Sequence, residues 1–322
     1  MATGVVRSDV NVQDLLEAGL HFGHQTKRWN PKMKRFIFGE KNGIYIIDLA
    51  KSLDLLTKAR QFIYDTVVRG RRILFVGTKK QARDTIKEMG DRLKQPYVIN
   101  RWLGGTLTNN TTIRKSIGRL RELEKLEQDG TMNTLPKKEV SRLRRELEKL
   151  QYNLCGITDM DQLPGALFVV DVMRESIAVA EANRLKIPVV AVVDTNCDPD
   201  PIDYAIPGND DAIRAVKLIL DSIGTTIQQA NNEYSKVAAE EARKRAIAEA
   251  EAAARARALD DERKAKEKAE RAEKVEKAEK PAEAAPKAKV EKPKAAEKAK
   301  PAVAPEVPPA PPAAPAGESA PA

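Results

Sequence analysis

Two histidines and three aspartates could bind a metal ion. His21 and His24 are the only histidines in the chain, and Asp194, Asp198 and Asp203 follow one another within ten residues. Imidazole nitrogens and carboxylate oxygens are ligands of zinc, and carboxylates also bind magnesium. The spacing matches no metal-binding pattern. We therefore predict no cofactor and interpret the histidines as hydrogen-bonding groups of a turn, while a site formed by loops that meet in space stays open.

A short glycine-containing segment could bind phosphate. Gly77-Thr-Lys-Lys80 follows an apolar run and precedes a polar, helix-forming segment, as a phosphate-binding loop does. However, neither Gly-x-x-x-x-Gly-Lys-Ser/Thr nor Gly-x-Gly-x-x-Gly occurs, and one glycine frees few backbone N–H groups for a diphosphate. Gly104-Gly105 also lacks the rest of either pattern. A nucleotide-binding α/β enzyme or regulator therefore stays as the alternative hypothesis.

Covalent catalysis has no recognisable motif in this chain. The nucleophile turn Gly-x-Ser-x-Gly is absent, and Cys197 lies among aspartates rather than beside basic residues. With Cys155 it makes up the whole cysteine content, which excludes a disulfide framework and a zinc ribbon and fits a reducing cytoplasm. We therefore predict a protein that is not an enzyme, with no catalytic residues and no small-molecule substrate.

Basic and aromatic residues that could bind RNA are more numerous. Seven of them lie within the ten residues 27–36. Arg and Lys donate hydrogen bonds to phosphate oxygens, and an aromatic ring can stack on an unpaired base. The predicted RNA-binding residues are Lys27, Arg28, Trp29, Lys32, Lys34, Arg35, Arg71, Arg72, Lys79, Lys80, Arg101, Trp102, Arg114, Lys115 and Arg119.

The distribution of charge supports the same hypothesis. The formal net charge is +9, and residues 233–322 hold 20 basic and 18 acidic side chains. The remaining 36 basic and 29 acidic residues give the first part of the chain a net charge of +7. Excess positive charge on a folded region favours a polyanionic partner.

The elements that must position these residues alternate between strand and helix. Residues 73–77, 166–171 and 188–194 are apolar runs of strand type, and helical patterns cover residues 79–93 and 175–185. Strands that are apolar on both faces and separated by helices are typical of a parallel sheet covered on two sides. The sequence therefore predicts a doubly wound α/β domain over residues 1–105 and 156–230.

The chain between two of these strands is too long for one crossover. Apolar residues recur at helical spacing from Ile113 to Leu126, and again from Val140 to Leu154 at the 3,4 spacing of a coiled coil. Gly130 and Pro136 interrupt the pattern between them. We therefore predict an antiparallel helical hairpin, a coiled coil, inserted at residues 106–155.

The last third of the chain has a different composition. Residues 231–280 are rich in Ala, Lys, Glu and Arg, which predicts a charged helix without an apolar seam. Residues 281–322 are a Pro/Ala/Lys sequence of low complexity, and we expect them to be disordered. We see neither a secretion signal nor a run of 18 apolar residues, and expect a cytoplasmic protein without membrane contact.

Several ordered sequence blocks resemble one family. Leu15-Leu-Glu-Ala-Gly-Leu-His-Phe-Gly-His-Gln25 and Arg28-Trp-Asn-Pro-Lys-Met-Lys34 resemble the opening of the bacterial small-subunit ribosomal proteins numbered two. Further blocks follow in that family's order at residues 36–39, 73–79, 101–105, 107–109, 137–139, 145–149, 163–164, 166–169, 187–188, 193–196 and 206–216. The resemblance extends from Val10 to about Ile227.

The resemblance implies a flavodoxin-like sheet and a non-catalytic role. It implies binding to 16S rRNA, contact with neighbouring small-subunit proteins, and help in docking the large mRNA-binding ribosomal protein one. The chain departs from the family at residues 172–176, where a more polar, histidine-bearing stretch is common, and at Cys155, where Gly is common. The resemblance says nothing of the segment after Asn231, so an adaptor role for that segment stays a further alternative.

Overall fold

The computed structural model describes residues 10–278. These residues fall into two compact units that divide between Ala252 and Ala253. The segment predicted to be disordered, residues 281–322, lies outside the described residues. No helix in the described part is long and apolar enough to cross a membrane.

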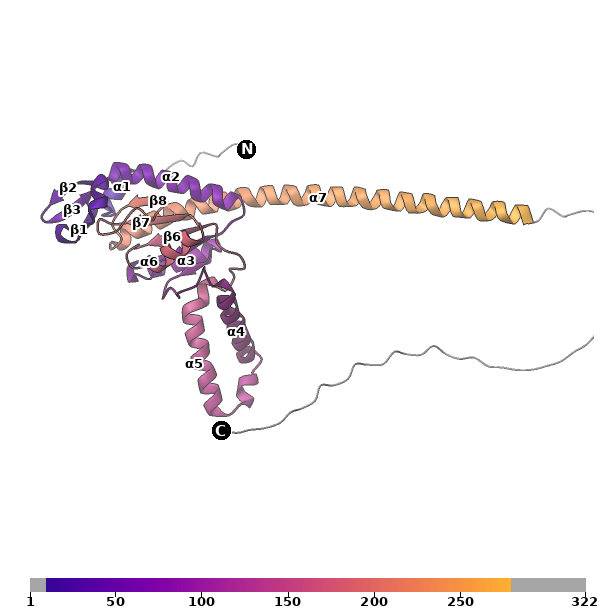
Figure 1. Ribbon diagram of the computed structural model, residues 1–322, viewed down its shortest axis with the longest axis horizontal. Helices are drawn as coiled ribbons and strands as arrows, with labels where there is room; N and C mark the ends of the chain where they lie inside the picture. Colours follow the sequence, from indigo (N-terminus) through magenta and orange to yellow (C-terminus); the bar gives the residue numbers. More distant parts are fainter. Residues whose placement is uncertain (1–9, 279–322) are drawn as a thin grey trace, which may run out of the picture. The chain divides into compact units, whose positions relative to one another are not determined.

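A five-stranded parallel sheet forms the centre of the first unit (Figure 1). Its strands are β4 (Ile73–Val76), β5 (Tyr97–Val98), β6 (Ala166–Val170), β7 (Val189–Val193) and β8 (Tyr204–Pro207). Their spatial order is β5-β4-β6-β7-β8, so the direction of winding reverses between β4 and β6. This confirms the mainly parallel, doubly wound α/β fold that the alternating pattern predicts.

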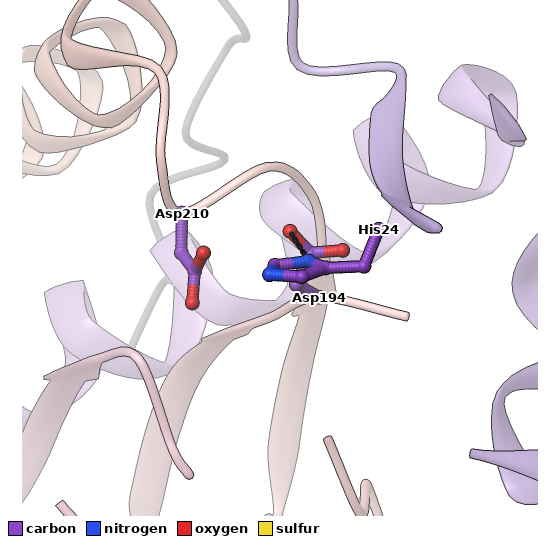
Figure 2. A group of neighbouring side chains, drawn as sticks. All are labelled: His24, Asp194 and Asp210. Atoms are coloured by element: carbon purple, nitrogen blue, oxygen red, sulfur yellow. Dashed lines mark ion pairs between the residues drawn. The ribbon is translucent and has the colours of Figure 1, made fainter. Parts of the chain in front are cut away.

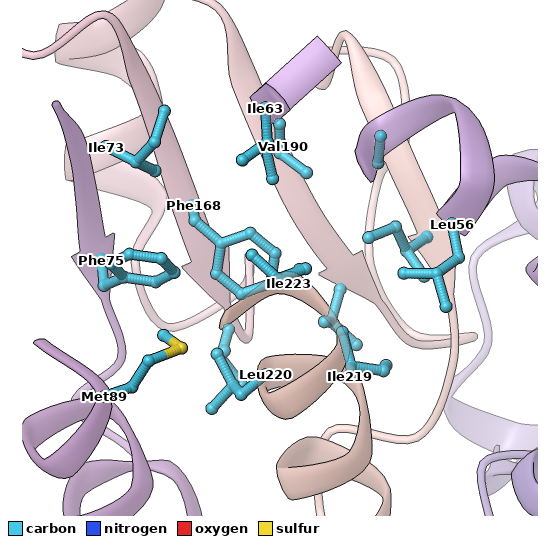
Figure 3. Packing of buried hydrophobic residues seen from close by; sticks show 14 of the residues in the cluster. Leu56, Ile63, Ile73, Phe75, Met89, Phe168, Val190, Ile219, Leu220 and Ile223 are labelled. Atoms are coloured by element: carbon cyan, nitrogen blue, oxygen red, sulfur yellow. The ribbon is translucent and has the colours of Figure 1, made fainter. Parts of the chain in front are cut away.

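Both faces of this sheet are buried, which explains why its strands are apolar without alternation. Ile73 and Phe75 of β4 belong to one hydrophobic cluster, and Leu74 and Val76 belong to another. The first cluster contains α2 (Leu49–Val68), α3 (Lys80–Leu93) and the start of α7 (Ile213–Ala278), as Figure 3 shows. The second cluster contains buried residues of α6 (Ser176–Arg184) and of the two helices that lie between β5 and β6 in the sequence.

Two helices occupy most of the segment between β5 and β6. They are α4 (Asn110–Gln128) and α5 (Lys137–Leu154), and the short 3-10 helix η3 (Thr131–Thr134) connects them. Gly130 enters this connection at a φ of +70°, a conformation that favours glycine. Leu120 and Leu123 of α4 and Leu147 of α5 are buried in one cluster. The apolar stripes of the sequence therefore form the contact between the helices.

A small antiparallel sheet precedes the parallel one and is only partly predicted by the sequence. It consists of β1 (Phe22–Gln25), β2 (Ile37–Lys41) and β3 (Ile44–Ile47) in the order β1-β3-β2, after helix α1 (Val12–Glu17). The sequence places His21 and His24 in a turn, whereas the structure places His24 in strand β1. Most residues of β1 and β2 are exposed or half-buried, so these strands lack a regular apolar pattern.

Helix α7 continues without a break through the composition change at Asn231. Residues up to Ala230 contribute buried side chains to the core, whereas the described side chains after Asn231 are mostly exposed. Within the second unit, Lys266 and Glu262 form an ion pair of 3.4 Å between successive turns. At Asn231 the side chains of α7 therefore change from largely buried to largely exposed, but the helix does not end there.

Candidate nucleic-acid interface

The segment Lys27–Arg35 is held in place by polar contacts of its own backbone. It forms the 3-10 helices η1 (Thr26–Arg28) and η2 (Pro31–Phe36). The Asn30 side chain caps η2 by accepting a 3.0 Å hydrogen bond from the Lys32 amide. The Asn30 amide donates a 2.8 Å hydrogen bond to the Thr195 carbonyl. We call Lys27, Arg28, Lys34 and Arg35 the N-terminal basic group; all of them are exposed.

Two other predicted residues of this segment make internal contacts instead. The Trp29 ring is half-buried and packs on Tyr45, with ring centroids 5.1 Å apart. Lys32 donates to Asp198 at 2.7 Å and lies 2.6 Å from Asp200. These carboxylates raise the pKa of the Lys32 ammonium. Lys32 is therefore paired within the chain and contributes little free positive charge.

The parallel sheet separates the next predicted residues. Arg71 and Arg72 precede β4 at its amino end, whereas Lys79 and Lys80 follow β4 at its carboxyl end. Arg101 follows β5 and lies at the same carboxyl edge as Lys79, because the strands are parallel. Arg72 donates a 2.8 Å hydrogen bond to the Asp159 carbonyl. The sheet thus directs these predicted residues to two opposite edges.

The predicted residues of α4 differ in the same way. Arg114 and Lys115 are exposed on the first turns of the helix. Arg119 donates to Glu146 of α5 at 3.0 Å and to Glu122 at 3.4 Å. Arg119 therefore forms an ion pair that joins α4 to α5.

Trp102 requires a correction, because the structure places its ring in the core. The side chain is only 7% exposed, and its indole N–H donates to Glu181 at 3.0 Å. A ring in this position cannot stack on a base. The sequence predicts Trp102 as an RNA-binding residue, but its ring belongs to the hydrophobic cluster that contains Leu74 and Val76.

Glu181 of α6 is a structural anchor of this region that no sequence pattern indicates. Its carboxylate also accepts hydrogen bonds from the amides of Gly105 (2.7 Å), Leu107 (3.0 Å) and Thr108 (3.1 Å). Burial alone would raise its pKa, but these hydrogen bonds and the one from Trp102 outweigh burial and hold the pKa below its ordinary value. Glu181 therefore fixes the loop between Arg101 and α4.

The phosphate-loop candidate is surrounded by carboxylates. The Lys79 ammonium lies 2.8 Å from Asp210, 2.6 Å from Asp211 and 3.6 Å from Asp171. Burial disfavours its charge, but the hydrogen bonds to Asp210 and Asp211 outweigh burial and raise the pKa of Lys79. An anionic phosphate at this position would meet these carboxylates. Nothing in the described residues therefore favours the nucleotide-dependent enzyme.

His24 lies next to this group of charges, and Figure 2 shows it with Asp194 and Asp210. Its Nδ1 lies 3.0 Å from Asp194, and its Nε2 lies 3.6 Å from Asp211. The hydrogen bond with Asp194 raises the pKa of His24. Gly23 permits the close approach of strand β1 to Thr195, because a Cβ at Gly23 would lie 2.5 Å from the Thr195 methyl group. We call His24, Lys79, Asp171, Asp194, Asp210 and Asp211 the carboxylate cluster.

The donor atoms of the cluster could hold a cation. Ligand atoms of His24, Asp194 and Asp210 lie within 4.8 Å of one another, and this donor set suits zinc. Burial, and to a lesser degree the charge of Asp194, raises the pKa of Asp210 to about 6.

Of the aspartates considered from the sequence, only Asp194 belongs to this cluster. Asp198 pairs with Lys32, and Asp203 accepts from the Val189 amide. His21 lies outside the cluster, and burial lowers its pKa. Asp210 is far from His24 in the sequence, and only the fold brings the two side chains together.

These observations define a doubly wound α/β protein whose sheet edge carries a carboxylate cluster and whose N-terminal loops carry exposed cations. The family model of ribosomal protein S2 matches residues 15–230, which is two thirds of the chain. The chain therefore belongs to the ribosomal protein S2 family. It is a structural constituent of the small ribosomal subunit, associates there with ribosomal RNA in the cytoplasm, and belongs to a family that is generally not enzymatic.

Proposed function

We propose that this chain binds 16S rRNA mainly through the N-terminal basic group. The supporting observation is that the structure records no ion pair to a carboxylate for any of these four exposed cations among residues 10–278. Arg35 lies over the Phe36 ring at 4.8 Å, a contact that leaves its charge in place. Phosphate oxygens would replace water around these groups. Arg71, Arg72, Lys80, Arg101, Arg114 and Lys115 supply further exposed cations.

We propose a domain organisation that follows from the same arrangement. Residues 1–105 and 156–230 would form a flavodoxin-like core, and residues 106–155 a coiled-coil hairpin inserted in it. The strand order β5-β4-β6-β7-β8 and the buried leucines between α4 and α5 support this division. The charged helix from residue 231 would be a separate extension that serves contacts with partners.

We further propose that the region before α2 contacts neighbouring small-subunit proteins and helps dock the large mRNA-binding ribosomal protein one. Exposed apolar side chains support this proposal: Leu16 is 52% exposed, Phe22 47% and Phe38 80%. Large aromatic side chains are enriched at protein interfaces. Their place on α1, β1 and β2 is close in sequence to the N-terminal basic group, so one region would serve both RNA and protein.

Replacing the N-terminal basic group tests the RNA-binding proposal. The variant Lys27→Ala, Arg28→Ala, Lys34→Ala, Arg35→Ala should bind 16S rRNA more weakly in filter binding. The slope of log affinity against log salt should become smaller by about 3, since each lost phosphate contact removes about 0.7–0.9. In sucrose gradients the variant should be depleted from small subunits.

The matched control removes four exposed cations from other surfaces: Lys87→Ala, Arg184→Ala, Arg214→Ala and Lys217→Ala. This control should keep most of the wild-type slope. Equal slopes for both quadruple variants would contradict the proposal, because they would show that only the total charge matters.

A further inference from the structure

A groove lies at the carboxyl edge of the sheet, beside the carboxylate cluster. Its volume is about 820 Å³, and its walls come from the ends of β4 and β5, the start of α6 and the end of α5. Because the winding of the sheet reverses between β4 and β6, this is the edge where doubly wound proteins bind ligands. We call it the switch-point groove.

The groove carries positive charge. Arg101, Lys149 and Arg174 line it and are exposed. The acidic lining residue, Glu175, is buried, and its carboxylate accepts from the Thr78 amide at 3.0 Å and from the Thr78 hydroxyl at 2.5 Å. Thr78 therefore satisfies part of this carboxylate, and the charge of Arg174 also acts on it. Among the described residues, Arg101, Lys149 and Arg174 form no salt bridge, so they can still attract an anion.

An aromatic ring and an apolar side chain lie among these cations. Tyr152 is 57% exposed, and Ile177 is 57% exposed. The Tyr152 carbonyl accepts a 2.5 Å hydrogen bond from the Asn100 side chain, which ties this turn of α5 to the end of β5. This bond fixes the backbone of Tyr152 at the wall of the groove, and its exposed side chain is accessible to a ligand.

The part of the wall that contains Trp102 is fixed before any ligand binds. Trp102 lines the groove and is held by Glu181, and the same carboxylate holds Gly105 and Thr108. Arg101 directly precedes this fixed segment. A site whose walls are set by buried hydrogen bonds loses little conformational entropy on binding.

We propose that the switch-point groove binds an unpaired nucleotide of ribosomal RNA, with the base stacked on Tyr152 and the flanking phosphates on Arg101, Lys149 and Arg174. The inference rests on the proposed RNA-binding function and names a second site for it. A concave site of this size admits a splayed base but not a duplex, and an aromatic ring beside cations is the usual platform for single-stranded RNA.

Substitutions of Tyr152 test the stacking contact. With full-length protein and 16S rRNA, Tyr152→Ala should weaken binding about tenfold, as loss of one stacked base does, and Tyr152→Phe should keep wild-type affinity. Arg174→Ala should also weaken binding, whereas the control Arg184→Ala, at the other end of α6, should not. Photo-cross-linking with 4-thiouridine in the 16S rRNA should label a peptide that contains Arg101 or Tyr152.

The outcomes distinguish the groove from the N-terminal basic group. If Tyr152→Ala and Arg174→Ala bind as wild type and no groove peptide is labelled, while the N-terminal basic group still controls binding, the groove proposal is overturned alone. If Tyr152→Ala loses association with another subunit protein but not with RNA, the groove is a protein site and the proposal is likewise overturned. If the full chain does not bind 16S rRNA at all, the proposed function and the groove proposal both fail.

Discussion

The carboxylate cluster and the switch-point groove lie at the same edge of the same sheet, yet they have opposite charge. In the cluster, four carboxylates surround one lysine and one histidine, and Asp194 and Asp210 are each 1% exposed. In the groove, three exposed cations face solvent and the acidic residue is turned inward. The fold therefore determines where a ligand could bind, and the local charge determines which kind of ligand fits there.

The cations of the two regions consequently serve different purposes. Lys79 is held by three carboxylates, so removing it leaves like charges facing one another. Arg101 has no recorded ion pair within the described chain, so removing it leaves nothing unsatisfied. The same chemical change should thus affect stability in one region and RNA affinity in the other.

The largest effect is expected for Lys79→Met. Breaking a mostly buried ion pair leaves uncompensated charge, and we expect the free energy of unfolding to fall by about 3 kcal/mol in urea titrations. Lys80→Met, which removes an exposed lysine, should change it by less than about 0.5 kcal/mol. Similar losses for both variants would remove the distinction between the two regions.

The pH dependence of Lys79→Met sharpens the same test. Asp210 has a folded pKa of about 6, above its ordinary value of 3.8, so folding favours its protonated form. Stability linked to this group is present at low pH and is lost as pH rises through 6. The defect of Lys79→Met should therefore be smaller at pH 5 than at pH 8, because protonated Asp210 no longer needs a cation.

A smaller effect is expected for Glu181→Gln, which alters the wall of the groove. An amide there would present N–H donors to backbone N–H groups, and we expect a loss of about 2 kcal/mol of stability. The folded pKa of Glu181 is depressed, so the advantage of wild type should be present above pH 4.5 and shrink as pH falls further. Glu88→Gln, on an exposed turn of α3, is the control. An unchanged stability of Glu181→Gln would show that the loop is fixed by other contacts.

The smallest effect on stability is expected for Arg101→Met. The side chain is exposed, so the free energy of unfolding should change by less than about 0.5 kcal/mol. The affinity for 16S rRNA should nevertheless fall, with a salt slope smaller by about 0.7–0.9 for one phosphate contact. A marked loss of stability with full RNA affinity would assign Arg101 to the core and exclude it from the interface.

Local patterns predicted much of the fold. The apolar runs of β4, β6 and β7 are buried on both faces, so their composition alone identifies them as strands of a covered parallel sheet. The stripes of α4 and α5 predict those helices for a similar reason. By contrast, β1 and β2 have no repeating apolar pattern, because neither strand has a face that is fully buried.

The sequence by itself determined the family, the α/β class and which residues carry positive charge, because these depend on residue type and local order. Only the tertiary structure decided which of those charges are free. Lys32 and Lys79 are paired with carboxylates from distant segments, and Trp102 is buried against Glu181, 79 residues away. Coulombic pairing and burial act through space, and separation along the chain does not reveal them.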